Sequence, residues 1–210
     1  GERYENMSVT LSEGNNWTYT WKDLPIAGGE YSVEEIPVLG YESDVKTSDW
    51  KSTITNEVQT GSLLIAKQVK GEDDPNKKYH FTLKLLKEAN EGAETVSLNG
   101  TFGDVTFENG IAEFDVKAGS YVRVKGLPAG VYYTVQEGDY TKEGFNSPEY
   151  INQNGIVAKD ASVMVTVTNT KAGAVRTGDD GNVQLWAILA LLALMGCVAP
   201  VMDLRRRRRA

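Results

Sequence analysis

The chain has 210 residues, enough for one or two domains, and its 29 acidic and 22 basic residues give it a net charge of −7. Such an acidic surface disfavours nucleic acid as a partner. Because there is one histidine, His80, and one cysteine, Cys197, the chain offers few ligands for zinc and little for nucleophile–histidine catalysis, so we predict no enzyme activity, no metal and no cofactor.

Residues 8–169 consist of short runs that alternate apolar and polar residues between Gly, Asn, Asp and Pro. This pattern predicts an all-β sandwich without helices. The stretch VTLSEGNNWTYTW, residues 9–21, has the form strand, turn, strand, and residues 102–116 repeat that form around Asn109 and Gly110. We therefore predict a β-hairpin at each of these two places.

Two parts of the chain share one order of motifs. Residues 17–43 and residues 121–147 each contain a strand, a Leu-Pro pair, a turn with glycine, a Tyr-x-Val-x-Glu stretch, and a glycine before an aromatic residue. A strand with Thr-Asn follows each part, at 53–58 and at 165–171. This internal repeat predicts two units with a boundary near residues 59–61. The first unit lacks its opening strands, so we expect the chain to be the C-terminal part of a longer protein.

Strand parity places three polar side chains on apolar faces. Alternate residues of a strand share a face, so Lys67, Glu137 and Asn169 each lie on the apolar face of a strand. Their neighbours on those faces are Leu63, Ile65 and Val69, then Val131, Tyr133 and Val135, then Val163, Val165 and Val167. If the three polar groups were buried in one core without partners, the folded state would lose several kcal/mol of stability. The alternative is that Lys67 snorkels, Asn169 merely ends its strand and Glu137 lies on the surface.

The C-terminal residues form a separate segment. Residues 185–202 contain no charged side chain and approach the roughly 20 residues that a bilayer-spanning helix needs. Residues 205–209 are arginines, and such a cluster stays in the cytoplasm. We predict a single transmembrane helix at 183–204 and a basic cytoplasmic tail at 205–210, with everything before Gln184 outside the cell. This span either holds the chain temporarily or is a permanent anchor.

The order of these motifs, twice over, resembles the B-type repeat of collagen-binding adhesins and the related pilin domains of Gram-positive bacteria. The resemblance implies an all-β chain of tandem immunoglobulin-like, Cna B-type β-sandwich domains before the transmembrane helix. Residues 1–58 would be a truncated B-type domain and residues 61–170 a pilin-like one. The implied function is a structural stalk of a surface adhesin. Alternatives are a pilin subunit, for which Lys77 and Lys78 are generic linkage candidates, and a module that itself binds host matrix.

In that family a lysine on the first strand and an asparagine on the last strand join in an isopeptide bond, helped by a buried acid. Carried over to this chain, the resemblance implies a bond between Lys67 and Asn169 with Glu137 as the assisting acid. Burial favours the neutral amine and the protonated carboxyl, so the amine can attack the amide and release ammonia. In the first unit Glu35 and Asn56 match the acid and the asparagine, and the lysine has no counterpart.

The residues before the span resemble the sortase cell-wall sorting signal of Gram-positive surface proteins: Thr-Gly, a polar spacer, an apolar run and a basic tail. The motif lies in the linker we assign to residues 171–182, and the implied scissile bond joins Thr177 to Gly178. It is degenerate, because Ala174 and Val175 stand where the family has Leu-Pro. The implied partners are a sortase, peptidoglycan or a neighbouring pilin subunit, the membrane through the helix, and host extracellular matrix. The implied location is the cell surface, anchored to the wall.

Overall fold

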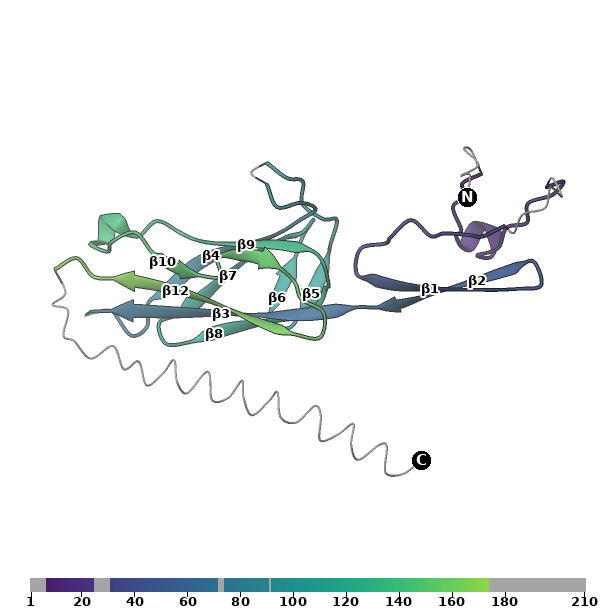
Figure 1. Ribbon diagram of the computed structural model, residues 1–210. Helices are drawn as coiled ribbons and strands as arrows, with labels where there is room; N and C mark the ends of the chain where they lie inside the picture. The colour runs from purple at the N-terminus through teal and green to yellow at the C-terminus, as the bar shows by residue number, and fades with distance from the viewer. Residues whose placement is uncertain (1–6, 25–30, 72–73, 91, 174–210) are drawn as a thin grey trace, which may run out of the picture. The chain divides into compact units, whose positions relative to one another are not determined.

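The computed structural model describes residues 7–24, 31–71, 74–90 and 92–173 (Figure 1). The chain divides into two compact units, one of Gly1–Glu35 and Val45–Ile54, the other of Ile36–Asp44 and Thr55–Ala210. The elements are η1 (Glu13–Asn15), β1 (Tyr41–Ser48), β2 (Lys51–Val58), β3 (Thr60–Lys70), β4 (Lys78–Leu86), β5 (Gly100–Phe102), β6 (Val105–Phe107), β7 (Ile111–Lys117), β8 (Tyr121–Pro128), β9 (Tyr132–Glu137), η2 (Thr141–Glu143), β10 (Glu149–Ile151), β11 (Asn154–Ile156) and β12 (Ser162–Thr170).

The second unit is a sandwich of two four-stranded sheets. One sheet has the strand order β10-β12-β3-β8 and the other β11-β9-β4-β7, while β5 and β6 form a separate pair (Figure 1). β12 pairs with β3 in parallel, from Ser162 opposite Ser62 to Thr170 opposite Lys70, whereas the other pairs in the two large sheets are antiparallel. The predicted all-β sandwich is confirmed for this unit, and its first and last strands are neighbours in the middle of one sheet.

Apolar side chains of both sheets fill the space between them. Fully buried examples are Leu63 and Ile65 of β3, Phe81 and Leu83 of β4, Val135 of β9, and Val165 and Val167 of β12. Burying one such side chain contributes about 1.5–3 kcal/mol. The middle of the β3–β12 pair is buried on both faces, since Leu64, Ala66 and Thr166 are at most 3% exposed. Burial alone therefore does not tell which face of this strand pair meets the opposite sheet. The side-chain contacts across the core decide that.

The turn predicted around Asn109 and Gly110 is confirmed, but the strands on its two sides do not pair as a hairpin: in the described chain β6 pairs with β5 and β7 with β4, and one isolated bridge, between Glu108 and Ile111, closes the turn. The backbone groups of Glu108 and Ile111 exchange hydrogen bonds of 2.9 and 3.0 Å across this turn. The φ angles of Asn109 and Gly110 are 50° and 77°, the paired positive values of a type I′ turn. A Cβ atom on Gly110 would lie 2.3 Å from the carbonyl oxygen of Val96. Both the backbone conformation and the available space therefore require glycine there.

The hairpin predicted for residues 9–21 is wrong. In its place lies η1, where the Asn15 side chain accepts a hydrogen bond from the Ser12 backbone N–H and donates one to the Thr10 carbonyl, each at 2.8 Å. These local bonds use backbone groups that a strand pair would need. A hairpin of the first half of the chain instead comes later, where β1 and β2 are joined through Asp49 and Trp50.

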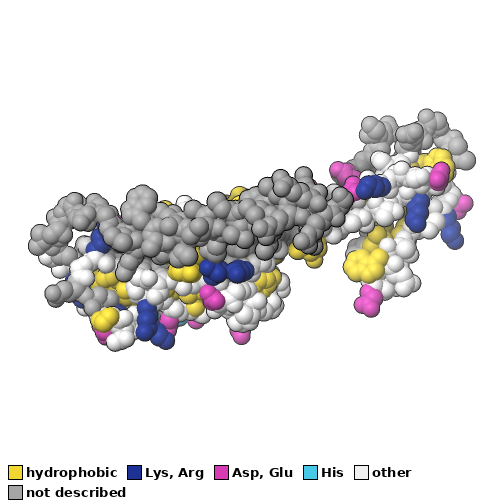
Figure 2. Space-filling view, turned by 90° about the horizontal axis from the view of Figure 1, so that it is seen from below, with side chains coloured by type: hydrophobic (Ala, Val, Ile, Leu, Met, Phe, Trp, Pro, Cys, Tyr) yellow, Lys and Arg dark blue, Asp and Glu magenta, His cyan; other side chains and the backbone are white. Residues whose placement is uncertain are grey.

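Among the described residues, no helix is long and apolar enough to cross a membrane. The predicted transmembrane helix at 183–204, the tail at 205–210 and most of the linker at 171–182 lie outside the described residues. Figure 2 shows acidic and basic side chains interspersed on one face of the described chain, with apolar side chains between them.

Candidate functional site

Lys67 and Asn169 lie on the two central strands of one sheet. In the parallel pair of β3 and β12, Lys67 stands opposite Val167 and Asn169 stands opposite Val69. Since alternate residues of a strand share a face, both side chains leave the sheet on the same side, two positions apart on neighbouring strands. Neighbouring strands lie about 4.7–4.9 Å apart, so a long side chain can reach a residue two positions along the next strand.

Glu137 comes from the facing sheet. It is the last residue of β9 and pairs with Phe81 of β4. Its Oε1 atom lies 3.1 Å from Lys67 Nζ, and both side chains are fully buried. Asn169 is 1% exposed, and its side chain lies against the Glu137 carboxyl. The burial that strand parity predicts is thus observed for all three residues, and none of them lies at the surface.

The polar atoms of this cluster are unequally satisfied. Lys67 Nζ donates hydrogen bonds to the backbone carbonyls of Gln68 at 2.9 Å and Val167 at 3.3 Å. It also lies 4.6 Å from the ring centroid of the buried Tyr79. In contrast, Asn169 Oδ1 and both carboxyl oxygens of Glu137 are buried without a hydrogen-bond partner among the described residues, although Glu137 Oε1 forms the ion pair with Lys67. An orphaned buried acceptor costs about 1–3 kcal/mol, so the Asn169 amide and the Glu137 carboxyl both lack hydrogen bonds that burial makes costly to lose.

Burial raises the pKa of the Glu137 carboxyl above its usual range, although the nearby charge of Lys67 opposes this shift. A carboxyl that keeps its proton can donate a hydrogen bond to the unsatisfied Oδ1 of Asn169. That bond would make the amide carbon more electrophilic. The amine of Lys67 beside it is removed from water, which favours its neutral, nucleophilic form. The arrangement therefore brings a nucleophile, an electrophile and an acid together in one dry site.

The other residues singled out in the sequence lie elsewhere. Glu35 is half-buried outside any strand, and Asn56 lies on β2 with an exposed side chain. Thr177 and Gly178 lie outside the described residues. Within the described part of the chain, no group of three His, Cys, Asp or Glu side chains is placed to hold a metal ion.

Sequence reasoning missed Tyr79. This tyrosine is on β4 with its ring beside Lys67 Nζ, and it packs edge-on against Tyr140 at a centroid distance of 4.9 Å. The signal was available, because Tyr79 shares strand parity with Phe81 and Leu83 in KKYHFTLKLL and so lies on the inner face.

Residues 61–171, which contain the whole Lys67–Glu137–Asn169 cluster, match the model described as domain of unknown function DUF7601. The chain belongs to the DUF7601 family. Ahead of the DUF7601 domain, residues 1–57 match the Cna protein B-type domain.

The DUF7601 chain is also similar to streptococcal pilus proteins. A pilin of Streptococcus pyogenes serotype M1 is 27% identical over 183 residues, which are 77% of this chain and 53% of the pilin. The chain thus spans about half the length of that curated relative. Together with the B-type match, this relative confirms the resemblance to Gram-positive pilins and Cna-type surface proteins. Neither name denotes an enzyme.

Two solved structures illustrate the structural comparison. The major pilin from Streptococcus pyogenes has a TM-score of 0.42 and 20% sequence identity, over 66% of this chain and 67% of that one. A pilus-presented adhesin has a TM-score of 0.42 and 22% identity, over 54% of this chain and 28% of that one.

Proposed function

We propose that the chain is a structural stalk module of a cell-wall-anchored surface adhesin, and that its second unit is stabilised by an isopeptide bond between Lys67 and Asn169. The observation that carries this proposal is the buried cluster itself: Lys67 Nζ lies 3.1 Å from Glu137 Oε1, beside an amide oxygen without a partner. A core that keeps these three groups unreacted bears a desolvation cost that the Lys67 hydrogen bonds and the ion pair offset only in part. Reaction would replace them with a neutral amide and one free carboxyl.

The proposed reaction balances without a co-reactant. The lone pair of the neutral Lys67 amine attacks Cγ of Asn169, while the Glu137 proton stabilises the developing charge on Oδ1. The bond from Cγ to Nδ2 then breaks, and one amine proton ends on Nδ2, which leaves as ammonia. Glu137 relays protons and returns to its starting state. The reaction takes place once per molecule, so it is maturation rather than turnover.

The intact mass of the full chain, produced by cell-free synthesis and measured under denaturing conditions, tests the bond. We expect the parent to weigh one ammonia less than its sequence, and Lys67→Ala and Asn169→Ala to weigh what their sequences predict. Lys70→Ala is a matched control, because Lys70 ends the same strand with an exposed side chain. Fragment masses should show one linked peptide that contains both Lys67 and Asn169. If parent and variants all have their sequence masses, the three residues form an ordinary buried cluster.

We propose further that the C-terminal segment anchors the chain: a helix at 183–204 holds it in the membrane until a sortase cuts between Thr177 and Gly178 and transfers it to peptidoglycan. The sequence pattern of the tail and the similarity to surface proteins of Gram-positive bacteria support this. In a Gram-positive host, a Thr177→Ala chain should stay in the membrane fraction while the parent enters the wall fraction. Equal fractionation would indicate a permanent membrane anchor.

The relative named as a pilin favours a second candidate, in which a sortase joins this chain to neighbouring subunits. Of the two linkage candidates, Lys78 is exposed on β4, whereas the Lys77 side chain is only 17% exposed. We therefore expect Lys78→Ala to remove denaturant-resistant multimers if the chain polymerises through this region. Multimers that persist in this variant would exclude Lys78 as the linkage.

A further inference from the structure

A second lysine approaches the site from the surface side. Lys77 precedes β4, and its Nζ lies 5.0 Å from the ring centroid of Tyr79, 4.8 Å from Tyr140 and 4.7 Å from Phe145. The same Tyr79 ring lies 4.6 Å from Nζ of Lys67. Tyr79 thus contacts both lysines, one of which is fully buried and the other 17% exposed. An ammonium placed over the faces of aromatic rings at such distances is attracted by the ring quadrupoles.

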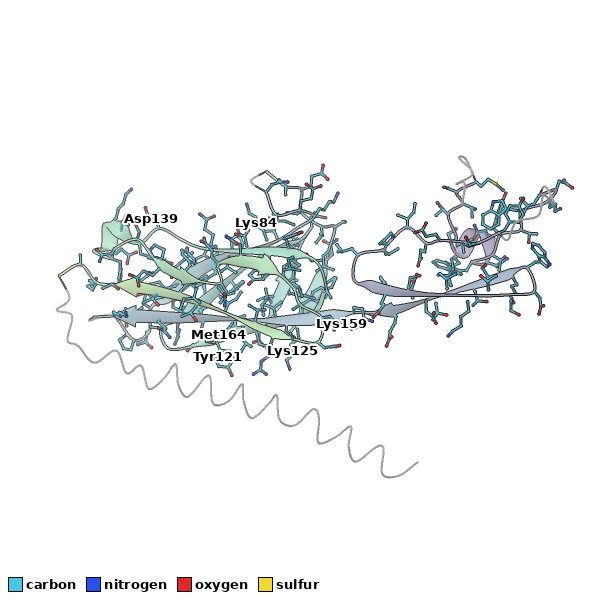
Figure 3. The ribbon with its side chains drawn as sticks, in the orientation of Figure 1. Lys84, Tyr121, Lys125, Asp139, Lys159 and Met164 are labelled. Atoms are coloured by element: carbon cyan, nitrogen blue, oxygen red, sulfur yellow. The ribbon has the colours of Figure 1, made fainter. Side chains whose placement is uncertain are left out.

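Two of these three rings belong to a loop that covers one end of the sandwich. We call residues 138–146, which include η2, the end cap. Figure 3 shows Asp139 of this cap at one end of the sandwich and Lys159 at the other. Lys77 forms an ion pair with Glu143 of the cap, and Glu143 is half-exposed. Lys77 therefore connects the start of β4 to the cap by charge and by ring contacts together.

The end cap is also joined to the chain directly after Asn169. The Asn146 backbone N–H donates to the Thr170 carbonyl at 2.9 Å, and the Ala172 N–H donates to the Gly144 carbonyl at 2.8 Å. Between them Phe145, which is 3% exposed, forms a bridge with Lys171. The position of the cap therefore fixes the backbone that leaves Asn169.

We infer that Lys77 is a positioning residue for bond formation, which holds the end cap closed over Tyr79 and so keeps water away from Lys67, Glu137 and Asn169. This inference rests on the proposed Lys67–Asn169 bond. Exclusion of water matters because the neutral amine and the protonated carboxyl are the forms that a dry site favours. Lys77 touches none of the reacting atoms in this arrangement, and its charge by itself lowers the pKa of Glu137, which opposes the protonated acid. A slower reaction without Lys77 would therefore reflect its contacts with Tyr79 and the cap.

The rate at which freshly synthesised full chain loses ammonia, followed by intact mass over time, tests the role of Lys77. We expect Lys77→Met, which removes the charge but leaves an unbranched apolar side chain, to slow the reaction by about tenfold, since small misplacements of reacting groups cost factors of this order or more. Lys77→Arg should restore the parent rate, since a guanidinium keeps both the ion pair and the ring contacts. Lys78→Met is the matched control, because Lys78 is the next residue in the chain and its side chain is exposed.

A second measurement separates cap closure from general stability. In the unreactive Asn169→Ala chain, hydrogen exchange at the amides of Asn146 and Ala172 should be faster with Lys77→Met than with Lys78→Met, while unfolding midpoints stay alike. If Lys77→Met loses ammonia as fast as the control, or if its slower rate only follows a smaller folded fraction, the inference is overturned and the bond stands. If the parent itself never loses ammonia, the proposed function fails and this inference fails with it.

Discussion

Glu137 has an environment unlike that of an ordinary surface carboxyl. Burial raises its pKa, and the ammonium of Lys67 at 3.1 Å only partly offsets that effect. A raised native pKa means that the folded chain binds a proton more tightly than the unfolded chain does. The stability contributed by this proton is fully present below the ordinary carboxyl pKa and is lost as pH rises through the native pKa.

We therefore expect the free energy of unfolding of the unreactive Asn169→Ala chain to fall as pH rises from the ordinary carboxyl pKa through the raised pKa of Glu137. Urea unfolding at a series of pH values measures this slope. The Glu137→Gln change in the same background removes the titrating group and should flatten the dependence within that window. An unchanged slope in the double variant would show that other groups cause it.

At the scale of elements, the turn between Glu108 and Ile111 depends on Gly110. A Gly110→Ala change meets two costs: a left-handed backbone, and a Cβ atom 2.3 Å from the Val96 carbonyl oxygen. Gly126→Ala meets only the first, because Gly126 has a φ of 74° and, apart from its chain neighbours, no described residue has an atom within 4 Å of the place its Cβ would take. We expect each substitution to lower the free energy of unfolding by about 1–2 kcal/mol through backbone strain, and Gly110→Ala to lower it further through the close contact. Urea unfolding of the two variants measures both effects. Equal losses would mean that the Val96 segment moves aside.

Strand parity predicted much of the site because it needs only local sequence. Lys67, Glu137 and Asn169 were placed on apolar faces by the two-residue period alone, and all three are buried. The same reasoning could not show that β12 pairs with β3 in parallel, since about 100 residues separate Lys67 from Asn169 and no local signal reports such a pairing.

Turn signals were a weaker guide. Asn109-Gly110 formed its type I′ turn, although the strands on its two sides belong to different sheets, β6 with β5 and β7 with β4. The similar Gly-Asn-Asn signal at residues 14–16 did not produce a hairpin, because the Asn15 side chain bonds to nearby backbone groups instead. The end cap and its ring contacts with Lys77 were also beyond sequence reasoning, since they join β4 to a loop far along the chain.

At the scale of the whole molecule, the proposed bond closes a loop of about 100 residues. By analogy with a disulfide, such closure contributes roughly 4–5 kcal/mol. We expect Asn169→Ala to unfold at a clearly lower temperature than the parent in differential scanning calorimetry, and the difference to be the same with and without a thiol reductant. Thr170→Ala, the next residue along β12, is the matched control. Equal melting of Asn169→Ala and this control would show that no covalent loop exists.

The parallel alignment of β3 and β12 decides how this sandwich would respond to being pulled. The chain enters β3 at Thr60 and leaves β12 at Thr170, and these residues lie at opposite ends of the strand pair. Tension on the two ends therefore loads the hydrogen bonds of this ladder in shear, all together, instead of opening them one after another. With Lys67 joined to Asn169, the load would pass from one strand directly to the other, and the chain between them would remain folded under traction that its hydrogen bonds alone could not bear.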